Sequence, residues 1–342
     1  MMSPAVQAFL ERRRDVGDRA RPRGAIHIGL VNNMPDSALE RTERQFFRLL
    51  SDAAPDLPIC WHLFSLAGIR RAEAGHIYLI HQNYRGLSDL FNTHLDGVIV
   101  TGTEPLHADL RQERYWPELA MLFDWIEAEG PSAIFSCLAA HAAVLHFDGI
   151  ERQPLEDKCF GLFNHEVFGG HPLALSLRTP PKVAHSRWNE VKADALKQAG
   201  YQILTSSREA GVDLFLRRAR KLMLFLQGHP EYDAEVLGLE YRRDVRRYLE
   251  GAVERYPDLP QYYFEQSEIE ALKRFRERAL PCRDVSLMDE FPERPLSRLR
   301  ELNGTGPRSS VFTAWLASIA QAKARQYGFV PARRSFVSAS LP

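Results

Sequence analysis

The feature that most constrains the fold is an alternation of short, mostly apolar runs with longer amphipathic ones. Residues 26–31, 96–102 and 132–136 contain apolar residues at consecutive positions, and not only at every second position. Strands of this kind are buried on both faces, as in parallel sheets covered by helices. Between them, DSALERTERQFFRLLSDA and YWPELAMLFDWIEAEG place apolar side chains at helical spacing. The sequence therefore predicts an α/β fold, with a mostly parallel sheet of the flavodoxin-like type and helices on both faces.

The second half of the chain is richer in strand-like segments, such as KVAHSRWNEV, QILTSS, GVDLFLRR and LMLFLQGHPEYD. A long polar helix is expected over about 234–254. Past about 262 the chain is charged and punctuated by proline, and an amphipathic helix, SSVFTAWLASIAQAKARQYG, follows. We expect three parts: a leader helix over 1–23, a main α/β domain over 24–262, and an extension over 263–342 whose helix packs on the core.

Composition excludes several classes of protein. Lys and Arg number 44 and so do Asp and Glu, so the zero formal net charge gives no reason to expect nucleic acid or an anionic membrane as a partner. No window approaches eighteen apolar residues, and the N-terminus lacks the apolar core of a secretory signal. The chain carries no dinucleotide or phosphate-loop glycine motif. We expect a cytoplasmic protein that acts on small molecules and has no bound cofactor.

The four cysteines form no C-x-x-C pair and no metal-finger spacing, so no metal site is expected. One of them, Cys137 in FSCLAAHAAVLHF, stands where an apolar strand meets an alanine-rich helix. Free backbone N–H groups and the helix dipole at such a junction favour an anion, which suits a thiolate nucleophile. Unpaired cysteine is also a frequent core residue, and the segment alone leaves both interpretations open.

A second motif, LMLFLQGHPEYD, supplies partners for a nucleophile. Pro230 disfavours helical backbone at His229 and pushes it to extended geometry. Side chains two apart on an extended segment point the same way, so Glu231 can reach the His229 imidazole and fix its tautomer. An isolated His-x-Glu is more often an ordinary turn. Together with the strand-end cysteine, it favours a triad of Cys137, His229 and Glu231.

With these motifs in place, the chain resembles the class I glutamine amidotransferase-like superfamily. Within it, the chain is similar to the homoserine O-acyltransferases of methionine biosynthesis, usually named homoserine O-succinyltransferases. The resemblance spans about residues 25–325. The matching stretches are IGLVNNMPDSALERTERQFFRLL, LDGVIVTG, YWPEL, FGLFNHEV, HSRWNEV, GHPEYDAEVLGLEYRRD and VFTAWL.

The resemblance implies a cytoplasmic acyltransferase in which Cys137 takes an acyl group from acyl-CoA as a thioester. His229 would be the general base, Glu231 would orient it, and the backbone N–H of Leu138 would stabilise the oxyanion. L-Homoserine would accept the acyl group, with succinyl favoured over acetyl, and the protein would form a homodimer. The substrate-binding positions that the resemblance implies are Ser186, Arg187, Glu240, Arg243 and, in the loop that sets acyl preference, Leu106 or His107.

The chain departs from the family pattern at several of these places. The family usually has Trp after the nucleophile and Gln four positions on, where this chain has Leu138 and His141. We interpret His141 as a pocket-lining or packing residue rather than a second base. A lysine turn of the family reads MPDS here, and the acyl-preference loop reads TGTEPLH. Two alternatives follow: a glutaminase or γ-glutamyl hydrolase with the same triad, or a non-catalytic ligand-binding homologue.

Overall fold

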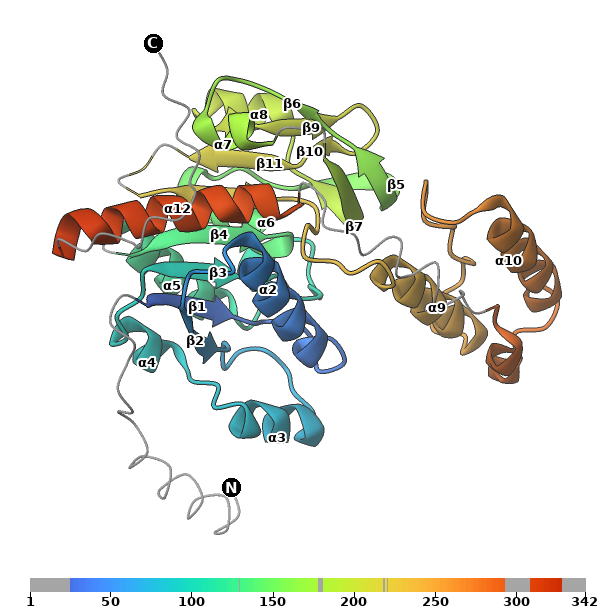
Figure 1. The fold of residues 1–342 in the computed structure, drawn as a ribbon. Helices are drawn as coiled ribbons and strands as arrows, with labels where there is room; N and C mark the ends of the chain where they lie inside the picture. Colours follow the sequence, from blue (N-terminus) through green and yellow to red (C-terminus); the bar gives the residue numbers. More distant parts are fainter. Residues whose placement is uncertain are drawn as a thin grey trace, which may run out of the picture.

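A seven-stranded sheet forms the centre of the computed structural model, which describes residues 25–128, 130–177, 181–217, 219, 221–292 and 308–327 (Figure 1). The strand order is β2-β1-β3-β4-β12-β11-β8; the first five strands run parallel, and the last two are antiparallel to their neighbours. In chain order the strands are β1 (Ile26–Val31), β2 (Ile59–Phe64), β3 (Gly97–Val100), β4 (Ser132–Ser136), β8 (Gln202–Ile203), β11 (Leu214–Arg217) and β12 (Met223–Leu226). The expected leader helix over 1–23 lies outside the described residues.

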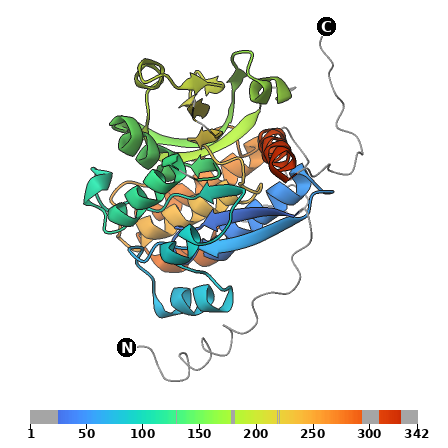
Figure 2. The same ribbon diagram turned by 90° about the vertical axis from the view of Figure 1, so that its left-hand side faces the viewer.

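Helices cover both faces of this sheet, as the apolar strands require. Val98 and Val100 of β3 pack with one layer, and Ile99 between them packs with the other. The first layer holds α4 (Leu87–Phe91), α5 (Trp116–Ala128) and α6 (Leu138–Asp148); the second holds α2 (Leu39–Ala53), α7 (Pro172–Ser176) and α12 (Arg308–Tyr327). Figure 2 shows α12 nearly end-on at one side of the sheet, opposite the green helices. The expected α/β class is confirmed.

Strands that follow α6 in the chain form smaller sheets beside the central one. The longer one is an antiparallel ribbon of β5 (Gln153–Asn164) and β7 (Lys182–Glu190). A second joins β6 (Glu166–Val167), β9 (Thr205–Ser207) and β10 (Gly211–Val212). The ribbon matters for function because β7 forms an antiparallel bridge from Ala184 to His229, which ties the HPE segment to its backbone.

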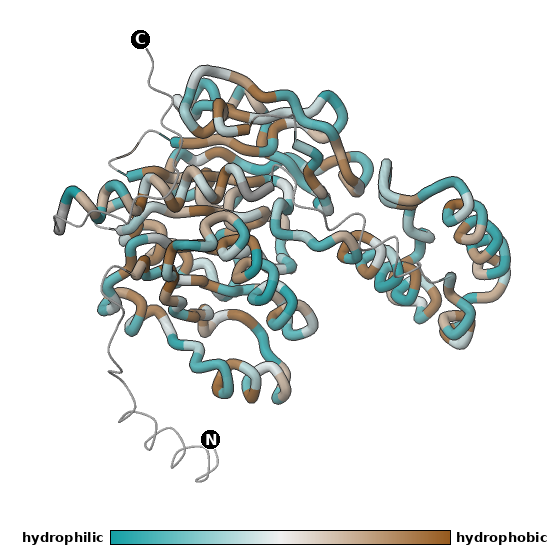
Figure 3. The backbone as a smooth tube through the Cα atoms, viewed as in Figure 1, coloured by the Kyte–Doolittle hydropathy of each residue, from teal (hydrophilic) through white to brown (hydrophobic). Residues whose placement is uncertain are grey.

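A third apolar cluster joins the ribbon to α9 (Val236–Leu249), α10 (Gln266–Ala279) and the 3₁₀ helix η3 (Val285–Glu290). The helices α9 and α10 lie together at one end of the molecule, and Figure 3 shows many hydrophilic residues, in teal, along them. Within the apolar interior, Tyr241 and Val245 of α9 are buried against Phe275 of α10. The remaining short helices are α3 (Glu73–His81), η2 (Leu110–Gln112) and α8 (Ala193–Gln198).

The helix α10 was not expected from the sequence. It lies in the charged stretch past 262 and begins with a capping box in which Glu265 and Glu268 satisfy each other's backbone N–H groups. Further on, Phe312 and Trp315 of α12 are buried against the sheet. The division of the chain into leader, main domain and extension remains a prediction. No described helix is long and apolar enough to span a membrane.

Candidate active site

Cys137 lies on a sharp turn between β4 and α6. Its backbone has φ 53° and ψ −114°, a left-handed region that residues with a side chain rarely adopt. The turn is held because the Cys137 N–H donates to the carbonyl oxygen of Leu226 on the neighbouring strand, at 2.7 Å. A strained strand-to-helix turn is how α/β hydrolases expose a nucleophile at the carboxyl edge of the sheet. Sequence reasoning predicted this junction, and the structure places the half-buried thiol there.

His229 and Glu231 follow β12, the strand next to β4. The Nδ1 atom of His229 lies 2.8 Å from Oε1 of Glu231, and both side chains are buried. The His229 backbone N–H donates to the Ala184 carbonyl oxygen of β7 at 2.8 Å, which holds the segment extended as Pro230 predicts. The imidazole stacks on the Tyr232 ring, with centroids 4.1 Å apart. Glu231 therefore fixes the ring orientation and leaves Nε2 for the thiol.

The electrostatics of His229 suit a proton carrier. Burial by itself lowers the pKa of the imidazole, but the charges of Cys137 and Glu231 and hydrogen bonds to both raise that pKa well above its usual value. The hydrogen bond to Cys137 brings the thiol and the imidazole together. The raised pKa favours a protonated imidazole at this position.

The backbone beside Cys137 provides room for an oxyanion. Leu138 is the first residue of α6, and its N–H has no hydrogen-bond acceptor within the described ranges. Gly102, at the end of β3, lies against it: a Cβ built there would stand 2.9 Å from the Leu138 nitrogen. Only a residue without a side chain allows the end of β3 to approach the start of α6 this closely, next to a backbone donor that an oxyanion could use.

The thiol and the imidazole open into a cavity of about 760 Å³. Its floor is formed by strand ends and by the start of α6, and its far wall by α9 and the 253–261 segment. A cavity of this size fits a small substrate together with part of a larger donor. Among the residues expected at a site, those that line it are Cys137, Leu138, Ser186, Arg187, His229, Glu231, Glu240 and Arg243.

The expected substrate-binding residues Ser186, Arg187, Glu240 and Arg243 line the same cavity and are held by separate hydrogen bonds. Ser186 Oγ and Tyr232 Oη both donate to the Glu240 carboxylate, the latter at 2.7 Å. Arg187 is buried, and its guanidinium donates to the carbonyl oxygens of Asn189 and Ala210. Arg243 is held by the Asp244 carboxylate at 2.8 Å. The structure thus brings together positions that are 58 residues apart in the sequence, from Ser186 to Asp244.

Leu106 and His107 do not line the cavity, and the Leu106 side chain is 65% exposed. Their backbone N–H groups both donate to Oε1 of the buried Glu113, at 2.6 Å each. The earlier residues of the loop, Thr103, Glu104 and Pro105, take their place in the cavity wall. By accepting these two N–H groups, the Glu113 carboxylate holds Leu106 and His107 outside the cavity lining.

Comparisons with known proteins identify the family of this chain. The family model described as homoserine O-succinyltransferase matches residues 7–324. A homoserine O-succinyltransferase of Rhodopseudomonas palustris is 44% identical over 89% of this chain and 91% of that protein. One of Bradyrhizobium japonicum is 47% identical over 81% and 85%. The chain belongs to the homoserine O-succinyltransferase family.

Among solved structures, a glutamine amidotransferase from Methylobacillus flagellatus matches 86% of this chain and 95% of that chain, at 15% identity and a TM-score of 0.47. The assignment of the fold rests on the sheet order and on the helices of both faces. In this member of the homoserine O-succinyltransferase family, the half-buried Cys137 follows a central parallel strand, and His229 follows the neighbouring strand.

Several residues that line the cavity were not found from the sequence. They include Lys158, which pairs with Asp244 at 2.8 Å and lies over the Phe160 ring, and Arg152. Outside the lining, the buried Gln227 positions His141 by a 2.9 Å hydrogen bond to Nε2. Burial lowers the pKa of His141 to about 3, aided by Arg187, so this ring is neutral. A neutral ring in the cavity wall fits the prediction that His141 is a pocket-lining residue rather than a second base.

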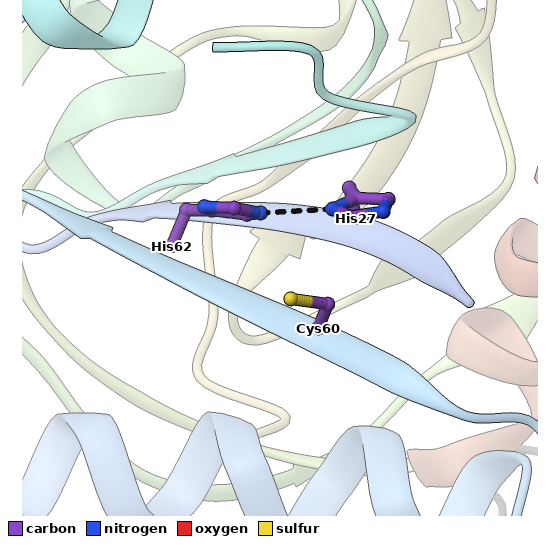
Figure 4. Close-up of side chains that lie close together, drawn as sticks. All are labelled: His27, Cys60 and His62. Carbon is purple, nitrogen blue, oxygen red and sulfur yellow. Dashed lines mark hydrogen bonds between the residues drawn. The ribbon is translucent and has the colours of Figure 1, made fainter. Parts of the chain in front are cut away.

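One cluster of metal-type ligands lies elsewhere in the described chain, on β1 and β2 (Figure 4). His27 Nδ1 and His62 Nε2 are 3.0 Å apart, and Cys60 lies beside them. Arg85, which can only donate, hydrogen-bonds Nδ1 of His62 at 3.1 Å. Nε2 of His62 then carries the hydrogen and donates to His27, whereas a metal ligand needs that lone pair. The cluster is a hydrogen-bond chain across neighbouring strands.

Proposed function

We propose that this protein transfers a succinyl group from succinyl-CoA to the hydroxyl of L-homoserine, through a thioester on Cys137. The observation that carries the proposal is the contact of Cys137, His229 and Glu231 in a cavity of a chain that belongs to this family. The chain is on this basis an acyltransferase, and its product, O-succinylhomoserine, would serve methionine biosynthesis. Acyl-CoA is a co-substrate, and no bound cofactor is needed.

In the first half-reaction, the Cys137 thiolate attacks the thioester carbonyl. The carbonyl oxygen becomes an oxyanion, and the Leu138 N–H is the donor nearest to it. The intermediate collapses with loss of the CoA thiolate, which takes the proton that His229 holds. Free CoA, the acyl-enzyme and a neutral His229 result. The raised pKa of His229 supports this order, because the proton is already in place before the donor binds.

In the second half-reaction, homoserine enters after CoA has left. Neutral His229 removes the proton of the homoserine hydroxyl as its oxygen attacks the acyl carbonyl. The Cys137 thiolate leaves, and the enzyme returns to its starting state with the proton on His229. Glu231 keeps the imidazole oriented and stabilises its charge in both halves. The polar group of Ser186, Tyr232 and Glu240 is suited to the acceptor's ammonium and hydroxyl groups.

The test is an assay of the purified protein with homoserine and a panel of acyl-CoA thioesters. We expect CoA thiol release that depends on homoserine, and a succinyl adduct on Cys137, detected by intact mass, when homoserine is omitted. Cys137→Ala should lose both signals. Ammonia release from glutamine without CoA release would contradict the proposal and favour an amidase. Unchanged turnover in Cys137→Ala would contradict the covalent route.

We also propose a cytoplasmic location. All four cysteines are free thiols, as expected in a reducing compartment. The homodimer implied by the family resemblance stays a prediction, which sedimentation of the purified protein can test.

A further inference from the structure

The cavity contains more positive charge than its own carboxylates neutralise. Six Lys and Arg side chains line it. Four of them have a carboxylate partner within 3.2 Å, namely Lys158, Arg243, Arg247 and Arg255. The other two, Arg152 and Arg187, form no ion pair with any residue that the structure describes. A half-buried or buried cation without a counter-ion is unfavourable, unless a ligand brings the negative charge.

Arg152 is held in place through neutral acceptors. Its Nη2 donates to the carbonyl oxygens of His107 and Ala108, at 2.9 and 3.0 Å, and Nε donates to Ala108 at 3.3 Å. These bonds fix the plane of the guanidinium and leave Nη1 without a hydrogen-bond partner in the described chain. A fixed guanidinium with a free edge is suited to a carboxylate.

The acidic side chains near Arg152 are occupied by other groups. Oε1 of Glu113 accepts the backbone N–H groups of Leu106 and His107. Asp109 pairs with Arg111 at 2.9 Å. The charges of Glu113 and Asp109 raise the pKa of Arg152, yet neither carboxylate forms an ion pair with it. The positive charge of Arg152 is therefore available inside the cavity.

Arg152 also lies near the nucleophile. It lines the same cavity as Cys137, and the loop that it holds continues from Thr103, Glu104 and Pro105 in the cavity wall. Although burial lowers the pKa of Arg152, the charge of Cys137 raises it, so the two groups interact electrostatically. An acyl group on Cys137 would extend into the space between the turn and this loop. The far end of that group is the part that could reach Arg152.

We propose that Arg152 binds the distal carboxylate of the succinyl group, both in the donor and on Cys137, and so selects a dicarboxylic acyl chain. The proposal rests on the proposed acyl transfer and adds the residue that recognises the donor. Arg187, the second unpaired cation, lies on β7 next to Ser186 and is then available for the carboxylate of homoserine. Two unpaired cations thus match the two carboxylates that the reaction brings in.

The experiment compares succinyl-CoA with butyryl-CoA, which carries a methyl group in place of the distal carboxylate. In Arg152→Gln we expect kcat/KM for succinyl-CoA to fall on the order of 100-fold, because a charged hydrogen-bonded pair is lost. Butyryl-CoA turnover should stay within about threefold, since no charge is recognised there. Arg152→Lys keeps the charge and should recover part of the succinyl-CoA activity.

The matched control is Arg111→Gln, an exposed arginine paired with Asp109 and Glu151 outside the cavity, which should change neither donor's kinetics. An equal fall for both donors in Arg152→Gln would overturn the proposal, because Arg152 would then only support the loop. Unchanged succinyl-CoA kinetics would overturn it as well. In both cases the proposed acyl transfer would still stand, because the wild-type enzyme would still turn over succinyl-CoA. A wild-type protein that turns over no acyl-CoA at all would contradict both proposals.

Discussion

Two histidines line the same cavity and are both almost fully buried, yet their pKa values move in opposite directions. His141 is 2% exposed and His229 is 7% exposed. Burial and the nearby Arg187 lower the pKa of His141 to about 3. For His229, the charges of Cys137 and Glu231 outweigh the same burial and raise the pKa well above its usual value. Charged neighbours, not burial, separate the two rings.

The difference follows from where each ring stands in the fold. His229 ends a strand, two residues before a carboxylate on the same extended segment, and faces a thiol on the next strand. His141 lies one turn after the nucleophile on α6, and its Nε2 bonds the neutral amide of Gln227. A histidine that is always neutral can orient a ligand but cannot carry a proton at neutral pH. Of the two rings, His229 is therefore the one suited to the proton transfers that we propose.

The largest difference between the two histidines is expected when His229, the proposed proton carrier, is replaced. His229→Gln should lower kcat for acyl transfer roughly 1000-fold, because no other group at the thiol can take up and return the proton. The measurement is the rate of CoA release at saturating homoserine, with thermal unfolding recorded to show that the variant folds. Retention of more than a tenth of the wild-type rate would mean that another base, such as His141, acts in its place.

A smaller effect is expected when His229 keeps its ring but loses its carboxylate. Glu231→Gln should lower kcat on the order of 100-fold and lower the pKa of His229. Acylation requires protonated His229 beside the thiolate, so its rate falls once pH rises above that pKa. The alkaline limb of the pH–rate profile should therefore move to lower pH in the variant. An alkaline limb that stays in place would show that Glu231 does not set the charge of the ring.

The oxyanion donor can be tested independently of both histidines. A Cβ at Gly102 would stand 2.7 Å from Leu138 Cβ and 2.9 Å from its nitrogen, so Gly102→Ala must displace the start of α6 or the loop. We expect kcat to fall about tenfold with the pH profile unchanged. Gly86→Ala is the matched control, since a Cβ there meets nothing within 4 Å. An equal kcat in the two variants would argue against an oxyanion role for the contact between Gly102 and Leu138.

The smallest effect should come from the neutral histidine. His141→Gln should change kcat by less than about threefold and leave the pH profile as it is, because the ring does not titrate near neutral pH. The lost hydrogen bond to Gln227 should lower the free energy of unfolding by about 1 kcal/mol, measured by urea denaturation. A shifted pH profile would show that His141 takes part in proton transfer.

Much of the sheet could be predicted, because several of its strands contain consecutive apolar residues. The expected strand over 26–31 has the same bounds as β1. Gly102, which was expected to end the strand over 96–102, follows β3. The triad followed from the same logic, since Cys137 and His229 end neighbouring parallel strands. The helix α10 was missed because its apolar positions, such as Leu272 and Phe275, are sparse among charges and carry little signal without the surface they pack on.

The cavity wall was harder to predict for a different reason. Lys158 and Arg152 lie in a stretch with no motif, and only the β5–β7 ribbon and the loop before η2 bring them to the thiol. Leu106 and His107 were expected in the site from their position in the loop. The two N–H groups held by Glu113 turn that part of the loop outward, and a single buried carboxylate seven residues away leaves no periodic signal.

The turn at Cys137 sets a limit on how stable this enzyme can be. A left-handed φ of 53° is a conformation that glycine adopts readily and that any side chain destabilises. Replacing the nucleophile with glycine should therefore give an inactive protein that melts at a higher temperature than the wild type. The proposed nucleophile would then also lower the stability of the fold, and selection for thermal tolerance alone would act to remove it.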